Sequence, residues 1–468
     1  MPPARASNKN SRASASGQPI PARDSTQPCP LSPSQERIWF WEQLNPGAHR
    51  CNESDAVRLK GQFEIEAFER AMNIIITRHD VLRSTIQVVN GIPLAVVHQN
   101  RPLVIKRIDF RELPEEKRNK EVERLLIEEP RRPYSLQNEP GIRATVICLT
   151  ADEHIFILMM HHIVFDRLSL NILWRELGTA YPALLRGLSP SLPPLPIQYG
   201  NYAAWKQDPE MEANHGADLA FWEDYLQGAL PILDLPADRP RPETLSDRCD
   251  KKSYRVGPAL VAKLQNLSRR EQTSLFNIFA ASLNTLLYRY AGQDDILLGI
   301  SIADRNRAEF QPLIGCLTDT QVLRTKLAGG ITWRELLSRV TLGVASVQMH
   351  KNIPFERGVK AVGAESCFGN SPFFRVMFNW HDQDVQRQFA GLMDLLVEPI
   401  PTHSGVSRCD LTFNVTNAID DLVIEVEYRT DLFDEDRIER MVGHYRTLLG
   451  AVAGDPDCRL ANLPLLTD

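Results

Sequence analysis

Two kinds of hydrophobic spacing alternate along the chain and predict helices and strands in turn. Between Glu64 and His79 the apolar residues recur every three or four positions, which is the spacing of one helix face. They are Ile65, Phe68, Ala71, Met72 and Ile75. Upstream, Ser32 and Pro33 form a typical helix start, because serine caps the first turn and proline suits its first position. We therefore expect a helix from Pro33 and an amphipathic helix over residues 64–79.

Two short apolar runs further along predict a buried β-hairpin. Residues 144–148 and 154–162 are rich in isoleucine, valine and methionine, and a polar turn separates them. Residues 168–185 then return to helical spacing, with leucines and aromatic residues on one stripe. His161 and His162 therefore stand at a strand-to-helix junction, where side chains are well placed for chemistry.

The second half of the chain shows a similar mixture of helix and strand patterns. Predicted helices cover residues 259–272, 275–290 and 434–453, and predicted strands cover residues 295–302, 373–378 and 422–428. Residues 189–196 (SPSLPPLP) contain four prolines, which favour an extended connector. We expect an α+β protein with one lobe over residues 28–190 and a second over residues 191–468.

Composition and charge exclude several classes of function. Hydrophobic residues make up 43% and charged residues 24% of the 468 positions, as in soluble globular proteins. The net charge of −6 offers no basic field for nucleic acid. The most apolar run, residues 155–160, is far below the roughly 20 residues that cross a bilayer. Residues 1–27 are rich in serine, alanine, proline and arginine, so we expect a disordered tail or linker there.

The eight cysteines indicate a reducing compartment. They are scattered without any Cys-x-x-Cys pair, in a chain large enough to be stable without disulfides. No apolar signal sequence precedes the Asn-x-Ser/Thr sequons. We expect free thiols and a cytoplasmic location.

The His pair admits three interpretations from residue chemistry alone. Adjacent strand residues point to opposite faces, so His161 and His162 reach one ligand only if the strand has already ended. A metal site that includes Asp166 is disfavoured by this geometry and by the lack of His-x-x-x-His spacing. A buried structural pair is the plainest interpretation. A neutral imidazole is also well suited to take a proton from an amine or hydroxyl.

Seven segments in order resemble the condensation domains of nonribosomal peptide synthetases, over roughly residues 28–468. The third contains His161-His162 through Asp166, with Ser169 just beyond, and resembles the active-site signature. The first two lie at residues 34–44 and 78–85, and the last four lie at residues 199–205, 314–324, 350–356 and 371–378. Any one of these segments is a weak signal, whereas seven in order are a strong one.

The resemblance implies a fold and an activity. It implies two lobes, each similar to chloramphenicol acetyltransferase, that form a V-shaped pseudodimer with a tunnel between them. Donor and acceptor carrier proteins would insert phosphopantetheine arms from opposite ends, and the domain itself would bind no cofactor and no metal. The product would be an amide or an ester, formed from a carrier-bound acyl or peptidyl thioester. We expect a monomer.

The resemblance also implies roles for individual residues. His162 would be the catalytic base or a positioning group, and His161 and Asp166 would hold its geometry. Asp166 would pair with an arginine, for which Arg83 is the preferred candidate and Arg78 the other. Residues 199, 205, 354 and 355 would shape lobe packing.

One departure from the family pattern lies beside the signature. The family signature ends Asp-Gly, whereas this chain has Arg167 after Asp166. Arginine there would narrow the donor channel, recognise an anionic group or mark a loss of activity. Arg167, Ser169 and Thr320 are therefore candidate tunnel or selectivity residues.

Other functions stay open at this stage. A free-standing acyltransferase of the same superfamily would use coenzyme A thioesters or soluble acceptors, although the plant-type Asp-Phe-Gly-Trp-Gly string is absent. A degenerate domain would only dock partner proteins, although both histidines are present. Residues 463–468 resemble the start of a linker to an adenylation domain, which would make the chain a piece of a larger synthetase. The identity and stereochemistry of donor and acceptor are not encoded in any recognisable motif.

Overall fold

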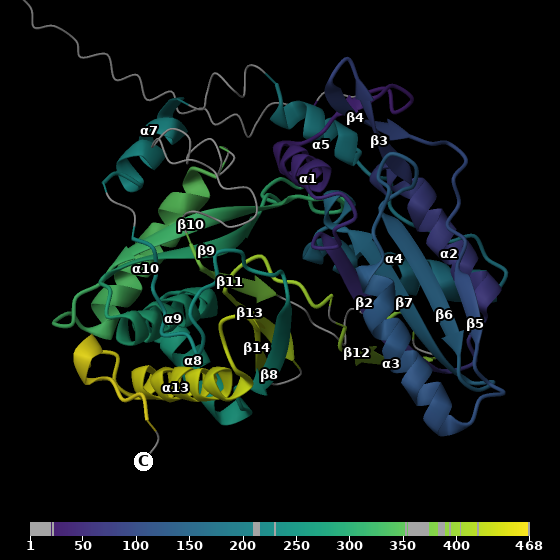
Figure 1. Ribbon diagram of the computed structural model, residues 1–468. Helices are drawn as coiled ribbons and strands as arrows, with labels where there is room; N and C mark the ends of the chain where they lie inside the picture. The colour runs from purple at the N-terminus through teal and green to yellow at the C-terminus, as the bar shows by residue number, and fades with distance from the viewer. Residues whose placement is uncertain are drawn as a thin grey trace, which may run out of the picture.

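The structure is a computed structural model in which two halves of the chain lie side by side (Figure 1). It describes residues 20, 23–208, 216–228, 231–351, 353, 374–381, 389–392, 395–402, 404–418 and 421–466. Most of the predicted tail, residues 352 and 354–356 of the sixth segment and residues 371–373 of the seventh lie outside the described residues. No helix among the described residues is long and apolar enough to cross a membrane.

The N-terminal half is built on a five-stranded sheet in the order β12-β2-β7-β6-β5. All neighbours are antiparallel except the parallel pair β5 and β6. The strands are β2 (Asn52–Gly61), β5 (Lys106–Asp109), β6 (Ile142–Cys148), β7 (Glu153–His161) and β12 (Leu395–Ile400). A smaller sheet beside it contains β1 (Cys29–Pro30), β3 (Ser84–Val89) and β4 (Ile92–Val97).

The central strand β7 is buried on both faces, which explains its unbroken apolar run. Phe156, Leu158 and Met160 share a hydrophobic cluster with α2 (Ile65–Arg78) and α4 (Arg167–Leu185). The alternate residues, from Ile155 to Met159, share another cluster with α3 (Glu115–Arg131). Because a strand covered on both sides has no polar face, the sequence pattern is continuous rather than alternating. This packing fixes the strand end at which the two histidines stand.

The C-terminal half is built on a six-stranded sheet in the order β10-β9-β11-β13-β14-β8. The strands are β8 (Cys249–Arg255), β9 (Asp295–Ala303), β10 (Thr318–Lys326), β11 (Val376–His381), β13 (Leu411–Ala418) and β14 (Asp421–Arg429). On one side it meets α8 (Pro258–Arg270), α9 (Leu275–Ala291), α10 (Trp333–Met349) and α13 (Glu435–Gly454), as Figure 1 shows. Alternate residues of β11, β13 and β14 point into this helical core.

The other face of the C-terminal sheet is polar. The residues that alternate with the core positions include Ser301, Asn379, Asn414 and Glu427, one from each of four neighbouring strands. Ser301 Oγ donates to Asn379 Oδ1 at 2.7 Å, and Asn379 Nδ2 donates to Asn414 Oδ1 at 2.9 Å. Asn414 Nδ2 donates to Glu427 Oε1 at 3.3 Å, which completes a row of side chains that we call the polar ladder.

The core and the sheet of the N-terminal half include segments from the second half of the chain. α5 (Tyr199–Lys206) and the loop residues Phe310–Leu317 pack into the core of the N-terminal half. β12 also joins the N-terminal sheet, next to β2. The division of the chain into residues 28–190 and 191–468 therefore stays a prediction, because the core of the N-terminal half also includes residues after position 190.

Most of the elements expected from sequence are present. α1 (Pro33–Leu44) begins after Ser32, whose hydroxyl accepts from Gln35 N, so the predicted cap is confirmed. The predicted hairpin is β6 and β7, and the predicted helices over residues 64–79 and 168–185 are α2 and α4. The strand predicted over residues 373–378 is shifted: β11 covers Val376–His381, because its ladder is set by parallel pairing with β13 and β9.

Candidate active site

The strand that carries the His pair ends between the two histidines. β7 ends at His161, and His162 begins the short 3-10 turn η3 (His162–Val164) that leads into α4. His162 N still donates to Cys51 O at 2.8 Å, one hydrogen bond beyond the paired strand β2. The two side chains therefore meet different neighbours.

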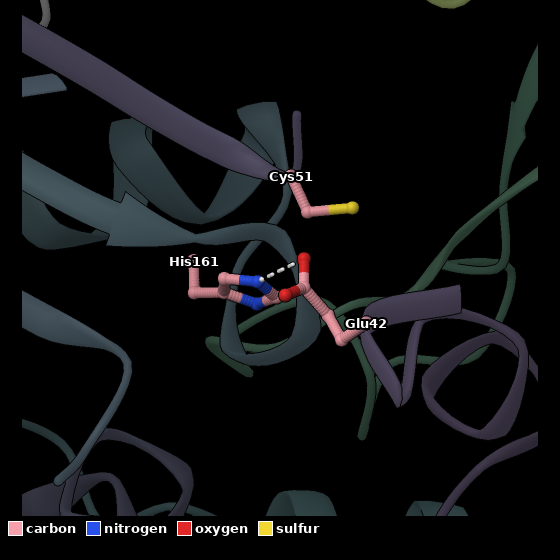
Figure 2. Close-up of side chains that lie close together, drawn as sticks. All are labelled: Glu42, Cys51 and His161. Carbon is pink, nitrogen blue, oxygen red and sulfur yellow. Dashed lines mark hydrogen bonds and ion pairs between the residues drawn. The ribbon is translucent and has the colours of Figure 1, made fainter. Parts of the chain in front are cut away.

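His161 is fully enclosed and held at both ring nitrogens. Its Nδ1 accepts a hydrogen bond from Ile163 N at 3.2 Å, so the proton of the neutral ring is on Nε2. That Nε2 lies 3.2 Å from Glu42 Oε1 of α1, as Figure 2 shows. The ring also packs edge-on against Tyr134. These contacts support the prediction that His161 is a structural histidine.

One group of side chains in the described part of the chain has the composition of a metal site. The ligand atoms of Glu42, Cys51 and His161 lie within 4.8 Å of one another (Figure 2). However, the bond from Ile163 N places the imidazole proton on Nε2, the atom that a metal would need. Burial also raises the pKa of the Cys51 thiol to about 11, which disfavours the thiolate. The residues present therefore fit a hydrogen-bonded cluster better than a metal centre.

His162 lies in a more open position. Its side chain is 17% exposed, and Nδ1 lies 3.3 Å from Glu53 Oε1 of β2. Nδ1 is buried, and the described residues offer it no hydrogen bond of good geometry. Burial, and next the positive charge of Arg408, hold the pKa of His162 well below its usual range. This shift favours the neutral ring near pH 7, and Nδ1 faces Glu53.

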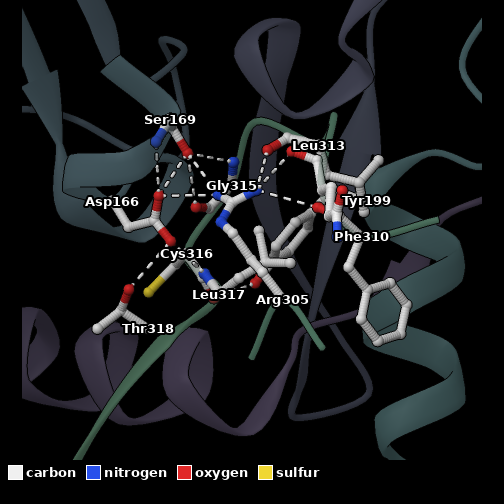
Figure 3. A network of polar contacts seen from close by, with 11 residues as sticks. Asp166, Ser169, Tyr199, Arg305, Phe310, Leu313, Gly315, Cys316, Leu317 and Thr318 are labelled. Atoms are coloured by element: carbon white, nitrogen blue, oxygen red, sulfur yellow. Dashed lines mark hydrogen bonds and ion pairs between the residues drawn. The ribbon is translucent and has the colours of Figure 1, made fainter. Parts of the chain in front are cut away.

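Asp166 anchors the loop behind the histidines through five donors. It caps α4, and its Oδ1 accepts from Ser169 N at 2.8 Å and from Ser169 Oγ at 2.6 Å. Arg305 NH2 donates to the same oxygen at 2.9 Å, and Figure 3 shows the arrangement. Its Oδ2 accepts from Leu317 N at 3.2 Å and from Thr318 Oγ1 at 3.1 Å. Asp166 is fully buried, so this carboxylate joins both halves of the chain by charge-assisted hydrogen bonds.

The partner of Asp166 is Arg305, so the prediction of Arg83 or Arg78 is wrong. Arg83 pairs instead with Asp80 in the short turn η2 (Asp80–Arg83). Arg78 Nε donates to Glu176 Oε1 at 3.0 Å. Both arginines therefore stabilise the helix end on which they lie, where a carboxylate is closer than Asp166.

Arg305 also shapes the loop that crosses from the second half of the chain. Its NH1 donates to Phe310 O at 3.0 Å and to Leu313 O at 2.7 Å (Figure 3). At the end of this loop, a Cβ on Gly315 would lie 2.0 Å from Tyr199 Cδ2, so only glycine permits the close approach. Tyr199 OH in turn donates to Cys316 O at 2.9 Å. These contacts support the packing role predicted for Tyr199.

The three candidate selectivity residues lie in different surroundings. Ser169 is fully buried within the Asp166 network, and Gly315 N donates to its hydroxyl at 3.0 Å. Thr320 lies on β10, directly across from Ser301 of the polar ladder. Arg167 is the first residue of α4, and its charge acts on both Asp55 and His381.

Charges of the N-terminal half act on the polar ladder and on His381 beside it. Burial raises the pKa of Glu427 to about 7, with further contributions from the charges of Glu425 and of Glu53. Burial and the charge of Arg167 lower the pKa of His381, next to the ladder on β11, to about 4. The charge of Glu53 thus acts on both Glu427 and His381, which indicates that this part of the polar face lies near the strand that carries Glu53.

Three functional candidates were missed from sequence. Arg305 lies 139 positions from Asp166 and outside the seven segments, so no spacing links the two. Glu42 lies within the first segment, but nothing in a helical pattern indicates that it faces His161. Glu53 stands beside His162 only because β2 pairs with β7 in one particular register.

Comparison with known proteins agrees with this geometry. The family model described as "Condensation domain" matches residues 25–468. A linear gramicidin synthase polypeptide of Brevibacillus parabrevis is 38% identical over 453 residues, covering 96% of this chain and 6% of that protein. Phosphinothricin tripeptide synthetase PhsC of Streptomyces viridochromogenes is 33% identical over 451 residues, covering 96% of this chain and 41% of that protein.

Solved structures show the same fold. The X-domain from teicoplanin biosynthesis has a TM-score of 0.84 at 24% identity, covering 96% of this chain and all of that one. The first condensation domain of the CDA synthetase has a TM-score of 0.76 at 17% identity, covering 95% of this chain and all of that one. The fold is therefore the two-lobed pseudodimer, similar to chloramphenicol acetyltransferase, that the sequence resemblance implied.

These findings define the class of protein. The chain belongs to the condensation domain family of nonribosomal peptide synthetases. Domains of this family are acyltransferases that work with carrier-protein domains. The chain spans 6–9% of the length of three linear gramicidin synthase polypeptides that it resembles.

Proposed function

We propose that this domain is catalytically active and transfers an acyl or peptidyl group from a donor carrier thioester to an acceptor amine or hydroxyl. The observation that carries the proposal is the state of His162: neutral, partly open, and set on a loop that Asp166 and Arg305 hold rigid. A general base has to be unprotonated and fixed in direction before the substrate arrives. The lowered pKa of His162 and the anchored loop on which it stands support these two conditions.

The reaction needs one proton transfer at His162. As the acceptor nitrogen or oxygen attacks the thioester carbonyl, Nε2 takes the proton that the nucleophile loses. The C–S bond then breaks, and the proton passes from the imidazolium to the departing phosphopantetheine sulfur. No covalent acyl-enzyme is required, and much of the rate would come from holding two tethered substrates in line.

The partners of the reaction follow from the same proposal. The donor and the acceptor arrive on phosphopantetheine arms of carrier proteins, and an adenylation domain would supply the acceptor carrier with its amino acid. Arg167 is proposed to lie near the donor channel, where its charge would favour or exclude anionic acyl groups.

The test is a reconstituted condensation. A donor carrier is loaded with candidate acyl groups, acceptors are added as carrier-bound or soluble amines and alcohols, and the product is followed by intact-protein mass spectrometry. We expect product with the wild type and with His444→Ala, a control histidine on α13 that contacts Tyr290. His162→Ala should reduce the yield to background.

The outcomes separate the competing functions. Equal yields above background for wild type and His162→Ala would overturn the catalytic role of His162. Product from acyl-coenzyme A but from no carrier-bound donor would indicate a free-standing acyltransferase. Binding of carriers without any product, across all donors and acceptors, would indicate a docking domain.

A further inference from the structure

The carboxylate of Glu53 is placed to act on His162. Glu53 lies on β2 immediately after Asn52, the residue that pairs with His161 across the ladder. Its Oε1 reaches to within 3.3 Å of His162 Nδ1, and no other carboxylate of the described residues forms an ion pair at that atom. We propose that Glu53 is a positioning residue that holds the Nδ1–H of His162 and so leaves the Nε2 lone pair directed toward the substrate. This inference rests on the proposed function.

The buried nitrogen itself points to this role. His162 Nδ1 is sealed from solvent and makes no well-directed hydrogen bond with the described residues. A buried polar atom without a partner is costly, so a small rotation that brings Nδ1–H onto the carboxylate is favourable. Glu53 is 36% exposed, which lets its side chain make that adjustment but also screens its charge.

The other charged groups around His162 do not replace Glu53. Arg408 before β13 and Arg37 on α1 disfavour the imidazolium, as does the neighbouring His161. Asp166 favours it, but both of its oxygens are already occupied by the donors described above. Glu42 is committed to His161. Of these carboxylates, Glu53 is therefore the one that can still accept a hydrogen bond from His162.

The two adjacent histidines would then carry opposite tautomers. His161 accepts at Nδ1 and has its proton on Nε2, facing Glu42. His162 would have its proton on Nδ1, facing Glu53, and its lone pair on Nε2. During the attack, Nε2 gains the proton of the nucleophile, and the carboxylate stabilises the imidazolium until the proton passes to the leaving sulfur. Burial and two arginines lower the basicity of this ring, and the charge of Asp166 offsets part of that effect.

The tautomer is measurable without any activity. Protein labelled with nitrogen-15 histidine reports by NMR at neutral pH which ring nitrogen carries the proton, and His162→Ala identifies the His162 signals. We expect the Nδ1–H form for His162 in the wild type. Glu53→Gln keeps an acceptor oxygen but removes the charge, so the tautomer should persist. Glu53→Leu removes the acceptor, so the Nε2–H form should appear. Glu398→Gln, on β12 of the same sheet and paired with Lys60, is the control and should change neither signal.

Kinetics give the second readout. Glu53→Gln should lower kcat about 10-fold with KM nearly unchanged, because the charge matters only when the imidazolium forms. Glu53→Asp should recover part of the loss. A His162 tautomer of Nε2–H in the wild type, or one that does not respond to Glu53→Leu, would overturn the inference even if condensation proceeds. Conversely, the expected tautomers in a domain that forms no product would leave the inference standing and reject the proposed function.

Discussion

The surroundings of His161 and of His162 differ although the residues are adjacent. His161 ends a strand, is fully buried, and has a partner at each ring nitrogen. His162 begins a turn, is partly exposed, and has a carboxylate near one nitrogen only. The same side chain is thus held at both ring nitrogens at one position and is partly exposed beside the carboxylate of Glu53 at the next. The end of β7 produces this difference, and four experiments test it.

The largest effect is expected from exchanging each histidine for alanine. His162→Ala should lower the condensation rate about 10²–10⁴-fold, the usual contribution of a general base, with little change in stability. His161→Ala should lower the free energy of unfolding by about 2–4 kcal/mol, because Glu42 and Ile163 N–H lose their partner. Urea denaturation and single-turnover rates measure the two quantities. If both variants lost the same amount of stability and of rate, the two histidines would not have distinct roles.

The next effect concerns the anchor behind both histidines. Arg305→Met should lower the free energy of unfolding by about 3 kcal/mol, because Asp166 is left as a buried charge. In a double-mutant cycle with Asp166→Asn, Arg305→Met should show coupling of about 1–3 kcal/mol. Arg83→Met, which breaks the pair with Asp80, should be additive with Asp166→Asn. Coupling to Arg83 instead of Arg305 would restore the pairing first expected from sequence.

A smaller effect is expected at Glu427 of the polar ladder. Burial lowers the pKa of His162 but raises that of Glu427 to about 7, because it disfavours the charged form of each. The usual value for Glu427 is 4.5, so the stabilisation by its protonated form is complete below that pH and is lost as the pH rises through 7. As the pH rises from 5 to 8, the free energy of unfolding of Glu427→Gln should therefore increase by about 1–2 kcal/mol relative to that of the wild type.

Unfolding curves at the two pH values measure this difference. The signs are opposite for the two groups, since the neutral form of His162 stabilises the fold above its unfolded pKa and that contribution is lost as the pH falls. Glu398→Gln, which removes an exposed ion pair with Lys60, should show no pH-dependent difference. A Glu427→Gln difference that is constant with pH would contradict a buried, protonated carboxyl.

The smallest effect is expected from Arg167→Gly. The substitution removes a charge that acts on Asp55 and His381, and it weakens the first turn of α4 by roughly 0.5–1 kcal/mol. We expect the preference for anionic over neutral acyl donors to fall severalfold while the rate with neutral donors is retained. Competition between donors, analysed by mass spectrometry, measures it. An unchanged preference would discard a selectivity role for Arg167.

The parts of the fold that sequence predicted well are those set by local rules. The cap at Ser32, the amphipathic α2 and the hairpin of β6 and β7 follow from spacing and turn chemistry within a few residues. The shifted strand β11 and the pairing of Asp166 are the errors, and both depend on partners far away in the chain. β12 could not have been assigned to the N-terminal sheet, because no local pattern says which edge a strand joins.

The sequence by itself determined the family and the identity of the two histidines, because seven ordered segments and a His pair at a strand end are readable along the chain. Only the tertiary structure decided which carboxylate faces which ring and which arginine holds Asp166. Glu42, Glu53 and Arg305 come from a helix, a strand and a loop that meet at the site only after folding. Side-chain partners depend on distance in space, and hydrophobic spacing records only which face of an element is buried.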